Sequence, residues 1–324
     1  MAAMPRDRDL LIGTLSAVVA ASLFGMLGPL ARFGAEAGVT GVAFTGWRAT
    51  MGVLFLALLI TLRGESGSSI AALRDLRPRG KVTLAVAALM GVTLNASMFS
   101  AFGMISIALV LMLFYTYPAG VVVVDLVLGR ERLSPARVVA LALSFAGVAL
   151  VLAGGMDTSS GIVVNPLGIA LSLGSAVSQV VFVSISRGGY ASVPAPAATL
   201  VILGTSMVGA SMIAVLVGQG GGLVAPLMSL DPWPYLLLAG VVAAGVSSLL
   251  FLTAIRRIGG TRTGILMLLE PVVGVILAAL WLGEALLPVQ LVGGGLVLAG
   301  ALVLQLASQP ANEPIAETDA SPVA

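Results

Sequence analysis

Ten apolar stretches, each about 20 residues long, constrain the fold of this 324-residue chain more than any other feature of its sequence. A helix needs about 20 apolar residues to cross the hydrocarbon core of a bilayer, so each stretch predicts one transmembrane helix. Most connections are short, and the longest are 63–81, 155–165 and 218–233. The expected spans are 10–31, 41–62, 82–102, 106–128, 136–154, 166–186, 194–217, 234–254, 263–283 and 289–308.

The composition excludes several classes of function. Only 9% of the residues are charged and 59% are hydrophobic, whereas a soluble domain carries about 25% charged residues. Cysteine and histidine are both absent, which excludes disulfides, thiolate metal sites and histidine-dependent catalysis. We therefore expect a membrane protein that is not an enzyme, with no cofactor, no metal and no nucleic-acid partner.

The distribution of basic residues predicts the orientation of the helices. Lys and Arg are enriched in cytoplasmic loops. With the N-terminus in the cytoplasm, fourteen of the sixteen basic residues fall on the inner side, and only Arg32 and Arg48 lie near the outer ends of helices. Both termini are therefore expected in the cytoplasm. A cleaved signal peptide over 1–25 is the rival interpretation of the first stretch, but that stretch has a partner later in the chain.

The two halves of the chain are internal repeats. Pro118, Glu131, Leu133, Pro135 and Gly147 recur 153 residues later as two prolines, a glutamate, a leucine and a glycine: Pro271, Glu284, Leu286, Pro288 and Gly300. Segment 13–32 matches 168–187 at a separation of 155. Each copy holds five helices, an odd number, so the second copy must lie upside down in the membrane. Inverted repeats are typical of alternating-access carriers with a site near the midplane.

We therefore expect an all-α membrane protein with ten transmembrane helices in two inverted five-helix repeats. The first repeat is expected over 10–154 and the second over 166–308. The Pro-, Ala- and acid-rich segment 309–324 is expected to be a disordered cytoplasmic tail.

Short motifs along the chain resemble one known family. They are Phe24-Gly25, Trp47-Arg48, Tyr117-Pro118, Glu131-Arg132-Leu133-Ser134, Glu270-Pro271 and Gly283-Glu284. In this order they resemble the ten-helix EamA-domain carriers of the drug/metabolite transporter superfamily, over residues 10–308. The first repeat departs from the family pattern because Arg130 separates Gly129 from Glu131. The resemblance implies secondary transport, often export, of small metabolites, amino acids or drugs.

The leading functional hypothesis is an exporter of small neutral, zwitterionic or aromatic metabolites such as amino acids, working by alternating access. A proton-coupled exporter of cationic drugs and a lipid-carrier flippase are the alternatives. The expected partners are a small-molecule substrate, the lipid bilayer and, as a candidate coupling ion, a proton. The high ratio of Arg to Lys indicates a GC-rich bacterial genome and hence the inner (plasma) membrane.

Polar residues at membrane depth are the candidates for the substrate site, because such groups are costly in lipid and usually face the protein interior. The repeat offset pairs them across the predicted two-fold axis. Glu270 is the candidate for substrate or proton binding, and the resemblance adds that glutamate before this proline recurs in the family. The predicted substrate-binding residues are Phe24 with Gln179, Asn95 with Ser248, and Tyr117 with Glu270.

Other residues are expected to have gating or structural roles. Pro118 and Pro271 are expected to kink their helices. Tyr115 is predicted to face another side of its helix than Tyr117, in packing or as a gate. For Ser247 and Ser248 a hydrogen bond to the preceding helical turn is the simpler interpretation.

Three further charged groups leave alternatives open. Arg48 is expected to be an anchor that snorkels to the outer interface, with an outer gate or substrate-carboxylate site as the alternative. Asp125 is expected to pair with Arg130 or Arg132, with a proton relay as the alternative. Glu131 and Glu284 are each expected to stabilise the N-terminus of the helix that follows, near Pro135 or Pro288.

Overall fold

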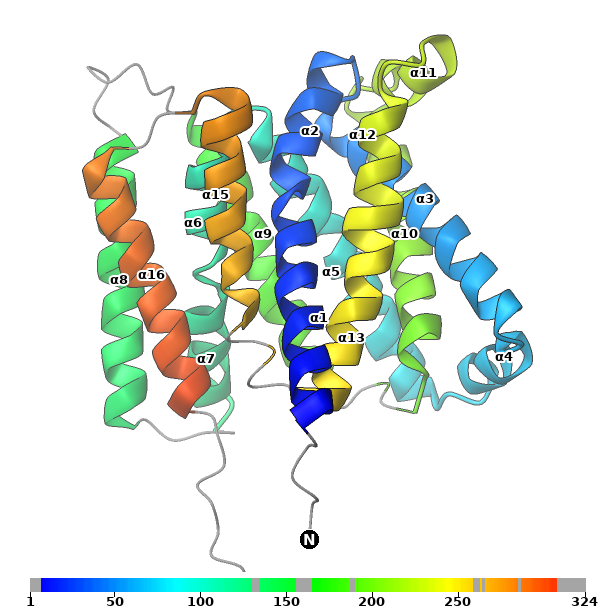
Figure 1. The fold of residues 1–324 in the computed structure, drawn as a ribbon, viewed down its shortest axis with the longest axis horizontal. Coiled ribbons are helices and arrows are strands. Elements are labelled where there is room, and N and C mark those ends of the chain that lie inside the picture. Colours follow the sequence, from blue (N-terminus) through cyan, green and yellow to red (C-terminus); the bar gives the residue numbers. More distant parts are fainter. Residues whose placement is uncertain are drawn as a thin grey trace, which may run out of the picture.

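A computed structural model of the chain describes residues 7–129, 134–155, 165–186, 190, 192–258, 263, 266–284 and 287–307 (Figure 1). Every regular element in these ranges is a helix. The expected tail 309–324 and the loop residues Arg130, Glu131 and Arg132 lie outside the described residues. The helices are α1 (Asp7–Gly25), α2 (Leu27–Glu36), α3 (Gly41–Leu62), α4 (Ser66–Arg74), α5 (Pro78–Phe102), α6 (Ile107–Phe114), α7 (Tyr117–Val127), α8 (Pro135–Gly155), α9 (Pro166–Ser186), α10 (Ala195–Leu216), α11 (Gly221–Met228), α12 (Trp233–Leu237), the π-helical η2 (Leu238–Val246), α13 (Ser247–Ile258), α15 (Leu269–Leu282) and α16 (Pro288–Ala307).

Each of the ten apolar stretches forms helix in the structure, which confirms the predicted fold class. Six helical runs among the described residues are long and apolar enough to cross a membrane, and four shorter apolar helices accompany them. Three of the expected spans are built from more than one element. They are the first (α1 and α2), the fourth (α6 and α7) and the eighth (α12, η2 and α13).

The break within the fourth span lies immediately before Pro118. Proline has no N–H for the helical ladder, and α7 begins with Tyr117 and Pro118 in its first turn. The carbonyl oxygen of Leu113 accepts from the hydroxyl of Thr116 at 2.7 Å and from the backbone N–H of Thr116 at 3.3 Å, which closes the end of α6. In the second repeat α15 begins at Leu269, two residues before Pro271. The structure thus interrupts both helices at the repeated proline.

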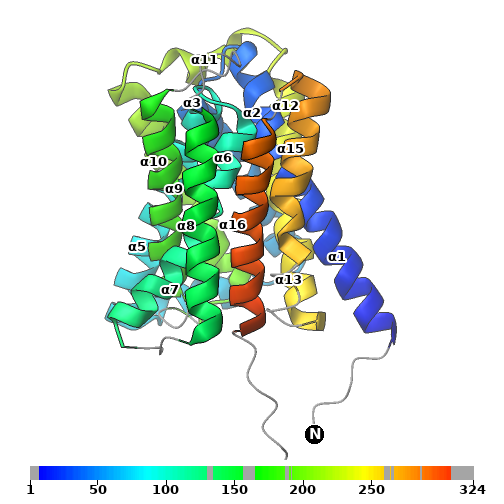
Figure 2. The same ribbon diagram turned by 90° about the vertical axis from the view of Figure 1, so that its left-hand side faces the viewer.

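Helix packing follows the two-fold relation between the repeats. α5 packs on α9 as α13 packs on α1, and the pairs α3–α10 and α8–α16 each join equivalent helices. α8 and α16 run side by side in Figure 2. A Cβ on Gly147 would lie 2.5 Å from the carbonyl oxygen of Gly293, and one on Gly300 would lie 2.8 Å from that of Ala140. These contacts are images of one another at the offset of 153, and both need glycine for the close approach of the helices.

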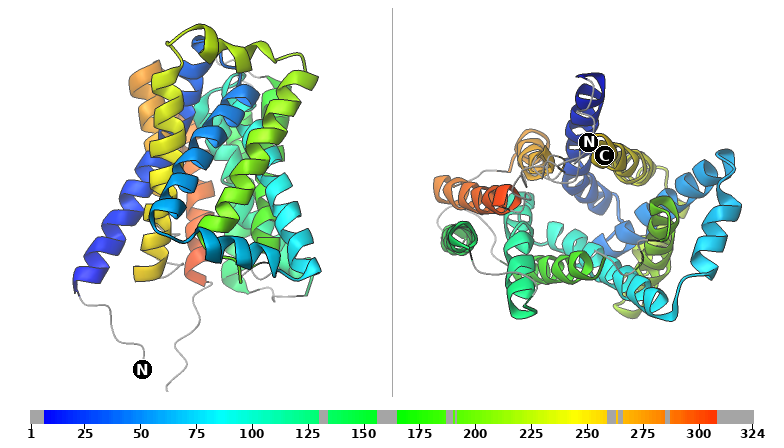
Figure 3. Two further views of the ribbon diagram at one scale, coloured as in Figure 1. Left: turned by 90° about the vertical axis from the view of Figure 1, so that its right-hand side faces the viewer. Right: turned by 90° about the horizontal axis from the view of Figure 1, so that it is seen from below.

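α1 begins and α16 ends at the same end of the bundle, the lower end in Figures 1 and 3. Two short helices were missed in the sequence because they are too short to span a bilayer. α4 lies at the lower end within the connection 63–81, and α11 lies at the upper end within 218–233. α4 is partly polar, with three serines and one arginine among its nine residues, so apolar length gave no signal for it.

Candidate functional site

A central cavity of about 300 Å³ lies where the interrupted helices of the two repeats meet. Residues from α1, α5, the α6–α7 break, α9, α13 and the start of α15 form its walls. Five of the six predicted substrate-binding residues lie in its lining. The lining residues are Phe24, Leu94, Asn95, Met98, Phe114, Tyr115, Tyr117, Gln179, Phe251, Met267, Leu268 and Glu270.

Ten of these twelve residues form five pairs related by the sequence repeat. The cavity therefore lies on the pseudo-two-fold axis, where carriers built from inverted repeats hold their substrates. The members of each pair differ in chemistry, so the cavity is symmetric in shape but not in charge. The pairs are Phe24 and Gln179 at the offset of 155, and at the offset of 153 Met98 and Phe251, Phe114 and Met267, Tyr115 and Leu268, and Tyr117 and Glu270.

Glu270 is the one carboxylate in this lining, and its partner is Tyr115. The phenol of Tyr115 donates a hydrogen bond to the Glu270 carboxylate. Tyr115 and Tyr117 both line the cavity, with their ring centroids 6.0 Å apart. The expectation that they face different sides assumed a continuous helix, in which residues two apart point roughly 200° apart. The break between α6 and α7 at Tyr115 and Thr116 removes that separation.

Arg48 does not snorkel to the membrane interface, and that interpretation is wrong. Its side chain is buried, and its Nη2 donates to Oδ1 of Asn95 at 2.6 Å. Its guanidinium carbon lies 5.0 Å from the ring centroid of Phe99. The ion pairs within the described ranges join Arg32 to Glu284 and Arg257 to Asp9, so no described carboxylate pairs with Arg48. Packing of α3 against α5 directs this side chain inward.

Asn95 lies between Arg48 and the cavity and is hydrogen-bonded to Arg48. Its Oδ1 accepts from Arg48 and its Nδ2 donates to the carbonyl oxygen of Gly91 at 2.8 Å. An amide nitrogen has two donors, so one N–H of Asn95 stays available on a residue that lines the cavity. The cavity thus has an anionic side at Glu270 and, behind Asn95, a cationic side at Arg48.

Ser248 is the predicted site residue that the structure leaves out of the lining. Its hydroxyl donates to the carbonyl oxygen of Ala244 at 2.6 Å, and that of Ser247 donates to Ala243 at 2.7 Å. Both bonds lie at the end of η2 and confirm the simpler interpretation of the two serines. Phe251, one helical turn later, reaches the cavity instead. Asp125 lies on α7, but its side chain is outside the described part of the structure.

The site residues missed in the sequence are all apolar: Leu94, Met98, Phe114, Phe251, Met267 and Leu268. Apolar residues carry no signal among so many others. The repeat offset of 153 nevertheless relates Met98 to Phe251 and Phe114 to Met267. If the offset had been applied to the apolar neighbours of the polar candidates as well, it would have identified these four residues.

Glu284 stabilises a helix N-terminus, but not that of α16. Its Oε2 accepts from the backbone N–H of Ile107 at 2.9 Å, in the first turn of α6. Arg32 donates to its Oε1 at 3.3 Å and to the carbonyl oxygen of Ile105 at 2.9 Å. Burial raises the pKa of Glu284 above its usual 4.5, although Arg32 and the amide of Ile107 act to lower it. We call Arg32, Ile105, Ile107 and Glu284 the end cluster; it ties α2, α6 and the end of α15 together.

Within the described ranges, no group of three or more acidic side chains is placed to hold a metal ion. The residues that line the central cavity offer hydrogen bonding, charge pairing and aromatic contact. Such a site can bind a small molecule and release it unchanged.

These features define a class: an all-α membrane protein of two inverted repeats around a cavity on their common axis. The chain belongs to the EamA-like transporter family, whose model matches residues 11–153 and 166–306. No curated protein matches the chain. One solved structure, described only as "Crystal structure of protein", is similar over 91% of this chain and 96% of its own, with a TM-score of 0.55 and 21% identity. That similarity concerns the fold alone.

Proposed function

We propose that this protein is a secondary carrier that exports small neutral, zwitterionic or aromatic metabolites, such as amino acids, by alternating access. The observation that carries the proposal is the placement of Glu270 and of Asn95, backed by Arg48, in one aromatic-walled cavity on the repeat axis. A zwitterion needs both an anionic and a cationic partner, because burying an unpaired charge is costly.

The geometry supports a particular orientation of the substrate. Its ammonium group binds Glu270, which already accepts a hydrogen bond from Tyr115. Its carboxylate accepts from the free N–H of Asn95, which Arg48 polarises. Phe24 and Phe114 contact an apolar or aromatic side chain, and Tyr117 adds a hydroxyl that hydrogen-bonds to the substrate.

Transport then consists of the two repeats rocking about this cavity. The end cluster closes the upper end by joining α2, α6 and α15. The protein is a multi-pass membrane protein; we place it in the inner membrane with both termini in the cytoplasm, so that the upper end faces outward. Reporter fusions at Gly221 should read as external and at Leu76 as cytoplasmic, and the reverse would overturn this orientation.

A proton-coupled exporter of cationic drugs is the second candidate, because Glu270 is the one carboxylate in the cavity lining. The two functions differ in their need for the cationic side. A zwitterion needs Asn95 and Arg48, whereas a cationic drug is repelled by Arg48.

Counterflow in proteoliposomes tests the proposal. Vesicles loaded with a mixture of unlabelled amino acids should accumulate labelled aromatic or small neutral amino acids, and Glu270→Gln should abolish the exchange. Glu65→Gln, a matched change at an exposed residue beside α4, should leave it unchanged. Exchange of cationic dyes without exchange of amino acids would favour the second candidate, and normal exchange by Glu270→Gln would refute the proposed role of this carboxylate.

A further inference from the structure

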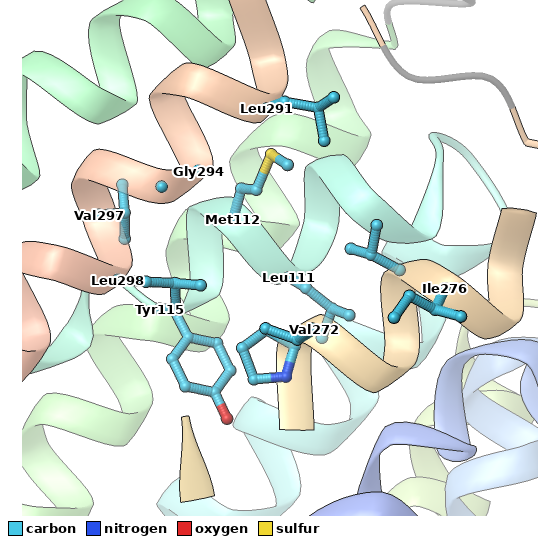
Figure 4. Close-up of a pocket in the computed structure, with 12 residues that line it drawn as sticks. Leu111, Met112, Tyr115, Val272, Ile276, Leu291, Gly294, Val297 and Leu298 are labelled. Carbon is cyan, nitrogen blue, oxygen red and sulfur yellow. The ribbon is translucent and has the colours of Figure 1, made fainter. Parts of the chain in front are cut away.

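A second cavity of about 280 Å³ lies beside the central one, between α6, α15 and α16 (Figure 4). The hydroxyl of Tyr115 is the one side-chain oxygen in its lining, and the lining side chains contain no nitrogen outside the proline ring. We call it the lateral cavity. Its lining residues are Leu111, Met112, Tyr115, Pro271, Val272, Val275, Ile276, Leu291, Gly294, Gly295, Val297 and Leu298.

The lateral cavity has a buried floor and an exposed rim. On the floor Val297 and Tyr115 are 1% and 5% exposed, while on the rim Val272, Ile276 and Leu291 are 40%, 50% and 52% exposed. α15 and α16 are apolar helices of a multi-pass membrane protein. The medium that meets this rim is therefore the hydrocarbon of the bilayer rather than water.

Tyr115 separates the lateral cavity from the central one, because it lines both. In Figure 4 its ring lies at one end of the lateral cavity, with the hydroxyl directed away from Ile276 and Leu291. That hydroxyl donates to Glu270 on the central side. A molecule in the lateral cavity therefore packs against the Tyr115 ring, whose hydroxyl binds the Glu270 carboxylate in the central cavity.

We propose that the lateral cavity binds a segment of a phospholipid acyl chain from the surrounding bilayer, which packs against the ring of Tyr115. An acyl chain needs no hydrogen-bond partner, and the walls offer almost none. A headgroup or the charged groups of an amino acid would be left unsatisfied there, which is costly. This site goes beyond the proposed transport function, because lipid can bind whether or not substrate moves.

The first repeat has a cavity beside α7 and α8, the equivalents of α15 and α16, and its chemistry is different. It measures about 340 Å³, lies between α7, α8 and α9, and includes Thr116, Tyr117 and Ser144. Ser144 is the repeat equivalent of Val297. Three hydroxyl-bearing residues instead of one make it less suited to hydrocarbon, so the acyl chain is assigned to the second repeat.

Fluorescence quenching tests the site directly, because the chain has no cysteine and single cysteines are clean probes. A Cβ on Gly295 meets nothing within 4 Å, so Gly295→Cys accepts a bimane label. In vesicles of phosphatidylcholine brominated along its acyl chains, the label at Gly295 should be quenched as strongly as one at the lipid-exposed Leu280. It should be quenched several-fold more than a label at Ser68, outside the apolar spans. Quenching at Gly295 no stronger than at Ser68 would overturn the proposal.

A filled cavity provides the second measurement. Gly295→Leu should occupy the lateral cavity and reduce the phosphatidylcholine that stays bound in native mass spectrometry. Gly174→Leu, at another open helical glycine, should retain it. Equal retention by wild type and Gly295→Leu would refute the site. Relief of the bimane quenching at Gly295→Cys by a transported amino acid would make the lateral cavity part of the substrate site and would equally refute the proposal.

Discussion

Glu284 caps a helix that lies far from it in the chain: its carboxylate accepts a hydrogen bond at 2.9 Å from the amide of Ile107, 177 residues earlier. The bond crosses from the second repeat to the first. α15 ends with Gly283 at φ 65°, and the N–H of Glu284 bonds back to the carbonyl oxygen of Ala278. This glycine-dependent helix ending turns the Glu284 side chain toward α6 rather than toward α16.

The stability contributed by Glu284 should fall as pH rises. Burial raises its folded pKa above the usual 4.5, so the folded protein binds this proton more tightly than the unfolded chain. The contribution is therefore fully present below pH 4.5 and is lost as pH rises through the raised pKa. The difference in Tm between wild type and Glu284→Gln should decrease over that range, while Glu65→Gln shows no such trend. A difference that grows with pH would show that Arg32 and the amides outweigh burial.

Replacing the two cavity tyrosines should have different consequences. Tyr115→Phe removes the hydrogen-bond partner of a buried carboxylate, so unfolding in micelles should become easier by about 1–3 kcal/mol. Tyr117→Phe should instead weaken binding of a hydrogen-bonding substrate by about 0.5–1.5 kcal/mol, the usual net contribution of one bond. Stability and substrate affinity, measured on both variants, separate the two roles. Equal effects on stability would contradict this division.

Arg48 and Asn95 should be strongly coupled. Their bond is short, partly buried and charge-assisted, and such bonds contribute about 1.5–3 kcal/mol. A double-mutant cycle with Arg48→Met and Asn95→Leu, followed by unfolding in mixed micelles, should give a coupling energy in that range. Additive effects would show that the bond contributes nothing, and that Arg48 is held by its contact with Phe99 alone.

The equivalent glycines at the α8–α16 contact should respond alike to substitution. Gly147→Val and Gly300→Val each place a side chain against the backbone of the facing helix. Each should lower the free energy of unfolding by about 1–3 kcal/mol, as overpacking does. Gly204→Val, at a helical glycine with open space around it, should cost less than either. If Gly147→Val left the free energy of unfolding unchanged while Gly300→Val lowered it, the two-fold packing would be contradicted.

Cysteine protection should map the cavity and exclude Ser248. A transported amino acid should slow the reaction of a permeant thiol reagent with Gln179→Cys and Phe251→Cys, since both positions line the cavity. Ser248→Cys should react at the same rate with and without substrate, because this position turns back toward Ala244. Protection of Ser248→Cys alone would move the site along α13.

The sequence by itself determined the ten helical spans, the inverted repeat and the family. The spans follow from the length of the apolar stretches, and the repeat and the family follow from residues that recur at one offset. Both features can be identified in the sequence without knowledge of any tertiary contact. The repeat also predicted that four residues lie close together, because a two-fold axis places equivalent residues around itself. They are Phe24, Gln179, Tyr117 and Glu270.

Only the tertiary structure decided which way individual side chains turn. One residue corresponds to a rotation of roughly 100° about a helix, so a break such as that at Thr116 redirects Tyr115 toward Glu270. Packing of α3 against α5 turns Arg48 from the interface to Asn95, and a backbone bond turns Ser248 away from the cavity. Apolar periodicity fixes neither helix rotation nor breaks in a chain that is apolar on every side. These orientations depend on contacts between helices, and they decide the charges that a substrate meets.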